Sequence, residues 1–249
     1  MCTLTILRDE GRVLVTMNRD DLAGRPEAAP AEWPSAKPTF VAPKDLQAGG
    51  TWIGVNADGI IACLLNRYDR APVGRTSRGF IVLEAMRNVS VDDICNALKA
   101  LDHAAYSPFT CILVDRDSST RLDWTGAYLT HTDLSANGGI IMVTSSSWQF
   151  DEVKAQREAL FRRIWANGGA AADRIATFHS RRDSAHDAWA PMMQRPQSQT
   201  KSVTQVELTA HGTEMRYWTR DAAIARQLAA PDASLRIPSP IRRDGRVQV

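Results

Sequence analysis

Strand-like segments come in groups in this sequence, and helix-like segments separate the groups. The strand-like segments are short apolar runs bounded by turn residues, at 2–7, 13–18, 49–55, 60–65, 110–114, 120–124, 140–144, 202–208 and 214–218. The helix-like segments lie at 77–87, 91–101, 150–165 and 170–178. This order lacks the strict βαβ alternation of a doubly wound parallel sheet. It predicts an α+β protein in which two antiparallel sheets stack between helical layers.

Three other segments follow neither pattern. Five prolines fall between residues 26 and 43, and proline disrupts both a helix interior and a central strand, so we expect an ordered surface excursion over 26–43. The segment 179–196 is polar and irregular, and its pattern predicts no element. The tail 231–249 contains three prolines and several arginines, and we expect an extended strap or a loosely ordered end.

The composition is that of an ordinary globular protein, with 44% hydrophobic and 23% charged residues. A length of 249 residues is near the upper end for one hydrophobic core, so we expect a single domain over 1–249. The net charge of +2 gives no electrostatic basis for binding nucleic acid or an anionic membrane surface. No apolar run reaches the roughly 20 residues of a membrane span, and the N-terminus lacks a secretory signal pattern. The four cysteines show no CxxC spacing, so we expect a soluble cytoplasmic protein with reduced thiols.

Cys2 directly follows the initiator methionine. Methionine aminopeptidase readily removes Met1 when the next side chain is small, and the mature chain would then begin with a thiol and a free α-amine on one residue. An α-amine has a pKa of about 7.7–8.0, so part of it is unprotonated near neutral pH. It can take the thiol proton and leave a thiolate, the form that attacks a carbonyl carbon. Cys2 would then supply both nucleophile and base.

Several short motifs accompany this cysteine. They are Met1-Cys2-Thr3, Asn18-Arg19-Asp20-Asp21, Arg25-Pro26, Gly49-Gly50-Thr51-Trp52-Ile53-Gly54, Leu65-Asn66-Arg67 and Ser77-Arg78-Gly79. Together they resemble the NRDE family, which includes the transport-and-Golgi-organisation proteins and takes its name from an Asn-Arg-Asp-Glu motif. The resemblance is clear over about residues 1–87 and continues more weakly to the closing strands. This family is similar to the N-terminal-nucleophile hydrolases, which implies a four-layer αββα sandwich.

Within that superfamily, the cysteine amidases that cleave bile salts and penicillin V share further motifs with this chain. They begin Met-Cys-Thr, carry Asn-x-Asp on the second strand, and have a Gly-x-Asn-x-x-Gly hairpin that runs into Leu-Asn. The resemblance implies that Asp20 holds the Cys2 amine and that Asn66 donates to a developing oxyanion. It also shows departures. Met17 stands where those amidases have an arginine, Ser145 stands where they have an asparagine, and an arginine from a later loop has no counterpart.

The alternation of side chains along a strand sends Asn18 and Asp20 to one face and Arg19 to the other. We expect Asp20 to face Cys2, whereas Arg19 either ties the hairpin to an acidic partner or meets an anionic ligand. The catalytic candidates are therefore Cys2, Asp20 and Asn66. The candidate substrate-binding residues are Asn18, Arg19, Gly50, Thr51, Trp52 and Ser145.

Two functions from different classes fit these motifs. The first is a hydrolase in which Cys2 attacks an amide or thioester of a small or acyl-bearing substrate. The second is a non-catalytic protein that binds and carries haem, acyl-coenzyme A or lipid, ligand classes to which the NRDE family has been linked. The sequence requires no cofactor and shows no zinc-ligand spacing. His179 and His186 lie beside Met192-Met193 and make haem a possible bound ligand, although no specific motif supports it.

A local basic cluster follows the Leu-Asn motif. It consists of Arg67, Arg70, Arg75 and Arg78. We interpret this cluster as a solvated loop rather than as a phosphate or carboxylate site.

Overall fold

The structure is a computed structural model of the chain, and it describes residues 2–9, 11–33, 39–68, 74–135, 139–183 and 187–237. Within these ranges the strands form two sheets, and every pairing between neighbouring strands is antiparallel. Sheet A has the order β10 (Ile140–Ser145), β1 (Cys2–Asp9), β2 (Arg12–Leu22), β11 (Ser198–Thr209), β12 (Gly212–Thr219) and β13 (Ala233–Ile237). Sheet B has the order β3 (Glu27–Glu32), β4 (Phe40–Asp45), β5 (Ile53–Asn56), β6 (Ile61–Asn66), β7 (Phe109–Val114), β8 (Ser119–Trp124) and β9 (Leu129–Asp133).

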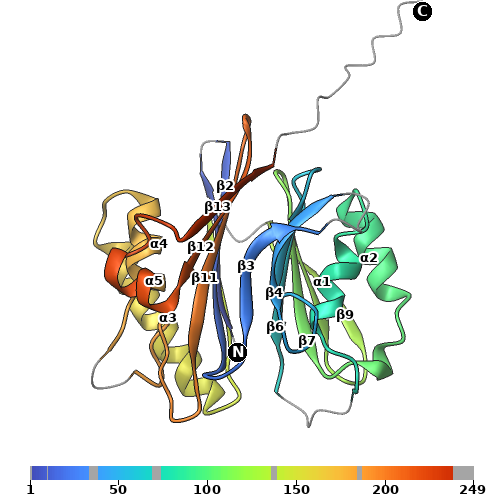
Figure 1. The fold of residues 1–249 in the computed structure, drawn as a ribbon, viewed down its shortest axis with the longest axis horizontal. Helices are drawn as coiled ribbons and strands as arrows, with labels where there is room; N and C mark the ends of the chain where they lie inside the picture. The colour runs from blue at the N-terminus through green and yellow to red at the C-terminus, as the bar shows by residue number, and fades with distance from the viewer. Residues whose placement is uncertain are drawn as a thin grey trace, which may run out of the picture.

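Helices cover the outer faces of both sheets. Figure 1 shows the sheets side by side, with one group of helices outside each. The helices outside sheet A are α3 (Phe150–Ala166), α4 (Ala171–His179) and α5 (Arg220–Arg226), and those outside sheet B are α1 (Gly79–Ala85) and α2 (Val91–Lys99). A short 3₁₀ turn, His103–Ala105, precedes β7. The predicted α+β fold, a four-layer αββα sandwich of two antiparallel sheets, is confirmed.

The alternation of side chains on β1 and β2 separates two layers. Leu4, Ile6, Val15 and Met17 point between the sheets, where they pack against apolar residues of sheet B such as Ile53. The intervening residues are largely polar and point toward the helices, yet they are buried as well; examples are Thr3, Thr5, Thr16, Asn18 and Asp20. A buried polar side chain needs hydrogen-bond partners, so the outer layer of sheet A must contain a polar network.

The segment 26–43 was predicted to be an ordered surface excursion because of its prolines. This prediction is wrong in part, because the segment contains β3 and most of β4, which belong to sheet B. Pro30 is in β3, an edge strand, where a missing amide donor is tolerated. Pro43 is in β4, but the pairing of β4 with β5 ends at Val41, and the register of β3 shifts between Ala28 and Ala31 opposite Pro43. The hydrogen-bond ladder of sheet B therefore requires no backbone N–H at Pro43. Residues 34–38 lie outside the described ranges.

Besides β3, β4 and the 3₁₀ turn, three further elements were not predicted from the sequence. They are β9, α5 and β13. In the expected C-terminal strap, residues 233–237 pair with β12, so the part that the structure describes is a regular edge strand; residues 238–249 lie outside the described ranges. The described helices are all too short or too polar to cross a bilayer.

Candidate active site

Cys2 is the first residue of β1 and lies at one end of sheet A. It pairs with Arg19 of β2 on one side and with Ser145 of β10 on the other. Directly opposed residues of antiparallel strands project to the same face, so the Cys2 sulfur shares the inner face of sheet A with Arg19. Only 6% of Cys2 is exposed. Its thiol can therefore meet a substrate only through a cavity.

Two cavities share one residue, Asn66. The smaller, which we call the nucleophile cavity, has a volume of about 160 Å³, and Cys2 is in its wall. Its other lining residues include Arg19, Asp20, Asp21, Arg25, Asp45, Thr51, Trp52, Arg78 and Gly79. The larger, which we call the apolar-walled cavity, has a volume of about 450 Å³. The apolar part of its wall is formed by Leu65, Val143, Trp148 and Phe150, and the polar part includes Arg67, Tyr68, Arg121, Ser145 and Lys154.

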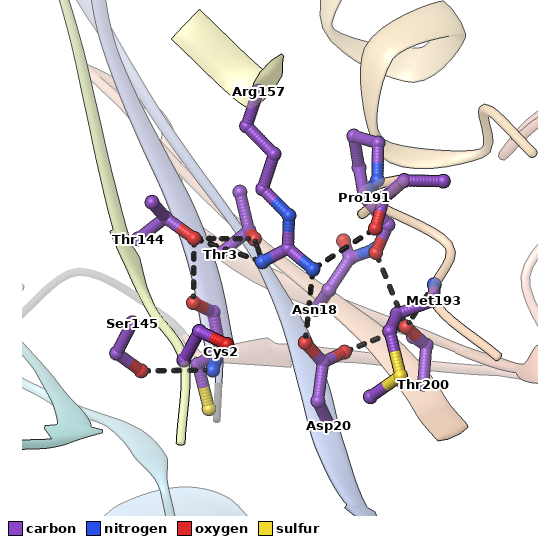
Figure 2. Close-up of polar contacts among 12 residues, drawn as sticks. Cys2, Thr3, Asn18, Asp20, Thr144, Ser145, Arg157, Pro191, Met193 and Thr200 are labelled. Carbon is purple, nitrogen blue, oxygen red and sulfur yellow. Dashed lines mark hydrogen bonds and ion pairs between the residues drawn. The ribbon is translucent and has the colours of Figure 1, made fainter. Parts of the chain in front are cut away.

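The nitrogen of Cys2 lies between β10 and the end of β2. Its N–H donates to Ser145 Oγ at 3.1 Å, as Figure 2 shows. The last pair between β1 and β2 is Cys2 with Arg19, so the next residue, Asp20, stands beside the end of β1. The Asp20 carboxylate projects to the outer face of sheet A, opposite the face that carries the Cys2 sulfur, whereas the Asp20 backbone N–H donates to the thiol.

The Asp20 carboxylate belongs to a buried network on the outer face (Figure 2). Its Oδ1 accepts a hydrogen bond from Thr200 Oγ1 at 2.6 Å, and its Oδ2 is 3.6 Å from Arg157 Nη2. Arg157 comes from α3 and donates to the hydroxyls of Thr3 and Thr144 at 2.6 and 2.8 Å. It also donates to two backbone carbonyls of residues 189–190. Arg157 is 1% exposed, so this guanidinium and the carboxylate form a fully buried ion pair.

Asn18 lies deeper on the same outer face and lines neither cavity. Its amide nitrogen donates to the carbonyls of His179 and Pro191 at 2.9 and 2.8 Å, and its oxygen is 2.5 Å from His179 Nδ1. The other ring nitrogen of His179 is 2.8 Å from Thr5 Oγ1. Asn18 is fully buried, and these hydrogen bonds hold the end of α4 to sheet A.

Of the two alternatives for Arg19, an acidic partner or an anionic ligand, the structure shows the acidic partner. On the inner face its guanidinium pairs with Glu27, with Asp21 at 3.0 Å and with Asp45 at 3.6 Å. It also lies over the Trp52 ring, 4.3 Å from the centroid. Arg19 thus ties the end of β2 to acidic side chains, although it remains in the wall of the nucleophile cavity.

The remaining candidates differ in how they meet the cavities. Asn66 ends β6 and lines both, and its amide nitrogen donates to Tyr68 Oη at 3.2 Å. Thr51 and Trp52 line the nucleophile cavity, whereas Gly50 is absent from its wall. A Cβ on Gly50 would lie 2.7 Å from the carbonyl carbon of Gly79, so this glycine lets two backbones touch beneath the cavity.

Burial raises the pKa of the Cys2 thiol, and the negative charge of Asp20 acts in the same direction. The positive charge of the N-terminal amine is the largest effect that opposes this rise; the backbone N–H of Asp20 and the charge of Arg19 add to it, and together they do not cancel the rise. The thiol is therefore protonated near neutral pH, and it needs a base before it can attack. The described part of the chain places no histidine in the lining of either cavity.

A model of the Transport and Golgi organisation 2 family matches residues 1–225. The chain belongs to this family. A search of curated proteins found no match. Among solved structures, the chain is similar to an N-acylethanolamine-hydrolyzing acid amidase ortholog from Caenorhabditis elegans, at 12% identity and a TM-score of 0.57, over 95% of this chain and 100% of that one. It is also similar to a mutant conjugated bile acid hydrolase from Clostridium perfringens, at 13% identity and a TM-score of 0.50, over 89% and 93% of the two chains. These likenesses establish the N-terminal-nucleophile hydrolase fold.

The structure explains one departure of this family member from the bile-salt and penicillin amidases. Met17 replaces their arginine before Asn-x-Asp, and it is fully buried in the core between the sheets. A different arginine, Arg157 of α3, reaches the Asp20 carboxylate from the outer face. The sequence analysis missed Arg157. Its signal was present, because Arg157 falls one helical turn after the buried Val153, on the face that a helix turns to the core.

Within the described ranges, no three His, Cys, Asp or Glu residues are grouped so that they could hold a metal ion. Both ring nitrogens of His179 are engaged, Met192 and Met193 are fully buried, and His186 is outside the described ranges. The described lining of the two cavities contains no histidine or methionine, and the side chains in it that can ligate haem iron are Cys2 and Tyr68.

Proposed function

We propose that this chain is an N-terminal-cysteine hydrolase that acts on an amide or thioester of a small or acyl-bearing substrate. The observation that carries the proposal is the position of Cys2, whose sulfur lines the nucleophile cavity while its nitrogen bonds Ser145 and adjoins Asp20. Asn66 lines the same cavity and provides an amide donor. A nucleophile, its base and an oxyanion donor would then share one site.

The reaction begins with removal of Met1, which converts the Cys2 amide nitrogen into an amine. The amine takes the thiol proton, and the thiolate forms a bond to the substrate carbonyl carbon. Asn66 donates to the oxyanion as the tetrahedral intermediate forms. The ammonium returns its proton to the leaving amine or thiol as the scissile bond breaks, and water then hydrolyses the acyl-enzyme. Asp20 and Ser145 hold the ammonium in place throughout.

The buried state of the thiol makes the free amine essential in this scheme. Because burial raises the pKa of Cys2, the thiol does not ionise by itself near neutral pH. A chain that keeps Met1 would therefore be inactive, even though its sulfur lies in the same cavity.

The test combines mass spectrometry of the N-terminus with hydrolysis assays on a panel of N-acyl amides and acyl thioesters. We expect a mature chain that begins at Cys2, and we expect Cys2→Ala to abolish turnover. Cys95→Ala is the matched control, because Cys95 is a buried thiol of α2 that lines neither cavity. Met1 retained on active protein, or full turnover by Cys2→Ala, would contradict the proposal.

The size of the apolar-walled cavity favours a second candidate, a non-catalytic carrier of haem, acyl-coenzyme A or lipid. At about 450 Å³ it is larger than the nucleophile cavity, and Leu65, Val143, Trp148 and Phe150 line it. Binding of acyl-coenzyme A or haem that is unchanged by Cys2→Ala, together with no turnover on the panel, would favour the carrier. Haem titration of Cys2→Ala is informative because it removes one of the two axial ligands, Cys2 and Tyr68, that the described lining offers.

A further inference from the structure

Three arginines line the nucleophile cavity: Arg19, Arg25 and Arg78. The first two are neutralised by carboxylates. Arg19 pairs with Glu27 and Asp21, and Arg25 makes a two-point contact with Asp45 at 2.5 and 3.1–3.2 Å. Neither guanidinium needs a further anion.

Arg78 differs from both of them. Among the described residues it has no carboxylate within 4.0 Å, and its one hydrogen bond goes from Nη1 to the Pro108 carbonyl at 2.9 Å. Its guanidinium also lies 6.0 Å from the centre of the Tyr68 ring. The side chain is half-buried, and burial lowers its pKa, an effect that the nearby Tyr68 and Cys2 oppose. A guanidinium that is partly removed from water and lacks a carboxylate retains donors for an anionic ligand.

The position of Arg78 links that ligand to the nucleophile. Arg78 directly precedes α1, and Gly79 after it contacts the backbone of residues 50–51. This contact fixes the start of α1 against the segment that precedes β5 and carries Trp52, and it holds the guanidinium in the same wall as Cys2. The planar fork of arginine matches the two oxygens of a carboxylate or of a similar anion.

We propose that Arg78 binds a small anionic group, such as a carboxylate, that the substrate carries beside its scissile bond. The proposal rests on the hydrolase function above and names its substrate class. The small anionic part occupies the nucleophile cavity, and the larger apolar part extends past Asn66 into the apolar-walled cavity. Arg78 is a specificity residue in this arrangement, and it takes no part in proton transfer.

Two pairs of probes that differ only in charge test this inference. N-decanoylglycine and N-decanoylglycinamide place the charge on the leaving-group side, and N-decylsuccinamic acid and N-decylsuccinamide place it on the acyl side. Because the two pairs place the charge on opposite sides of the scissile bond, we expect the charged member to have the higher kcat/KM in one pair only. Arg78→Gln should lower that kcat/KM by about 10- to 100-fold, the usual range for hydrogen bonds to a charged group, and leave the neutral member unchanged. Arg78→Lys should recover part of the loss.

Arg87→Gln is the matched control, because Arg87 is 64% exposed, pairs with Glu84 and lines neither cavity. Calorimetric binding of the same probes to Cys2→Ala separates the inference from the hydrolase function. Preferential binding of a charged probe that Arg78→Gln removes, without turnover by the mature chain, would support the inference and contradict the hydrolase. Equal binding of charged and neutral probes, or a preference that survives in Arg78→Gln, would overturn the inference whether or not turnover occurs.

Discussion

Consecutive residues of β2 enter two different environments at the active-site end of sheet A. Arg19 points to the inner face and is itself only 3% exposed, but its partner Asp21 is 25% exposed in its side chain and a cavity adjoins them. Asn18 and Asp20 point to the outer face, where α3 and α4 seal them from water. One short motif thus fixes the end of β2 from both sides. The inner side remains open to a ligand, and the outer side is closed.

The difference between the two faces has an energetic consequence. On the outer face, Arg157 and Asp20 form an ion pair whose side chains are 1% and 0% exposed. On the inner face, Arg25 and Asp45 form one whose side chains are 24% and 11% exposed. Removing one partner of a buried pair leaves an uncompensated charge in a medium of low polarity, whereas water and salt screen a partly exposed pair. Substitutions on the two faces should therefore differ in cost.

The largest effect is expected for Arg157→Met. Methionine fills much of the same volume but leaves the Asp20 carboxylate buried without its cation, and it removes donors to Thr3 and Thr144. The free energy of unfolding should fall by about 3–5 kcal/mol, the usual cost of breaking a buried ion pair. Denaturant titration followed by circular dichroism measures this change.

Arg162→Met on the exposed side of the same helix is the control, and it should change stability by less than about 0.5 kcal/mol. The double variant Arg157→Met with Asp20→Asn should recover part of the lost stability, because it no longer buries an unpaired carboxylate charge. An Arg157→Met variant as stable as Arg162→Met would show that the outer face is less closed than its burial indicates.

Most of the fold could be predicted because its elements carry local signals. The first hairpin alternates apolar and polar residues over 2–6 and 15–18, and Ser90 caps α2 by accepting a hydrogen bond from the Asp93 amide. The elements that were missed carry weaker signals. Four of the five residues of β9 are exposed, α5 has seven residues, and β13 depends on β12 for its pairing.

The site was predictable where family motifs named its residues and unpredictable where distant segments meet. Cys2, Arg19 and Asn66, which the motifs named, line one cavity. Arg157 was missed because its contact with Asp20 spans the gap between α3 and β2, which no local pattern encodes. Arg78 was assigned to a solvated loop because a run of arginines does not reveal which of them folds inward.

His179 offers a second test of the closed outer face, through pH. Burial, with the charge of Arg157 adding to it, lowers the pKa of His179 to about 3. An unfolded histidine titrates near 6.5, so below that pH the unfolded state binds a proton that the folded state does not. Stability must then fall as the pH falls from 6.5 toward 3. Between pH 7.5 and 5 the contribution of this one group is roughly 2 kcal/mol.

The measurement compares unfolding free energies at the two pH values in wild type and in His179→Gln. We expect the variant to lose roughly 2 kcal/mol less than wild type over this range, because glutamine does not titrate. His131→Gln is the control, since His131 is exposed on β9. Identical pH dependence in wild type and His179→Gln would mean that water reaches this imidazole.

The smallest effect is expected for Arg25→Gln on the inner face. This pair is partly exposed, so its loss should lower the free energy of unfolding by about 1 kcal/mol or less, and the loss should shrink further in 1 M salt. Burial raises the pKa of Asp45, but hydrogen bonds and charge from Arg25 outweigh it and hold this pKa below its ordinary value. Carboxyl NMR titration of Arg25→Gln should therefore find the pKa of Asp45 raised. If Arg25→Gln instead lowers the free energy of unfolding as much as Arg157→Met does, and this loss does not depend on salt, the inner face is as closed as the outer one. The contrast between the two sides of β2 would then be wrong.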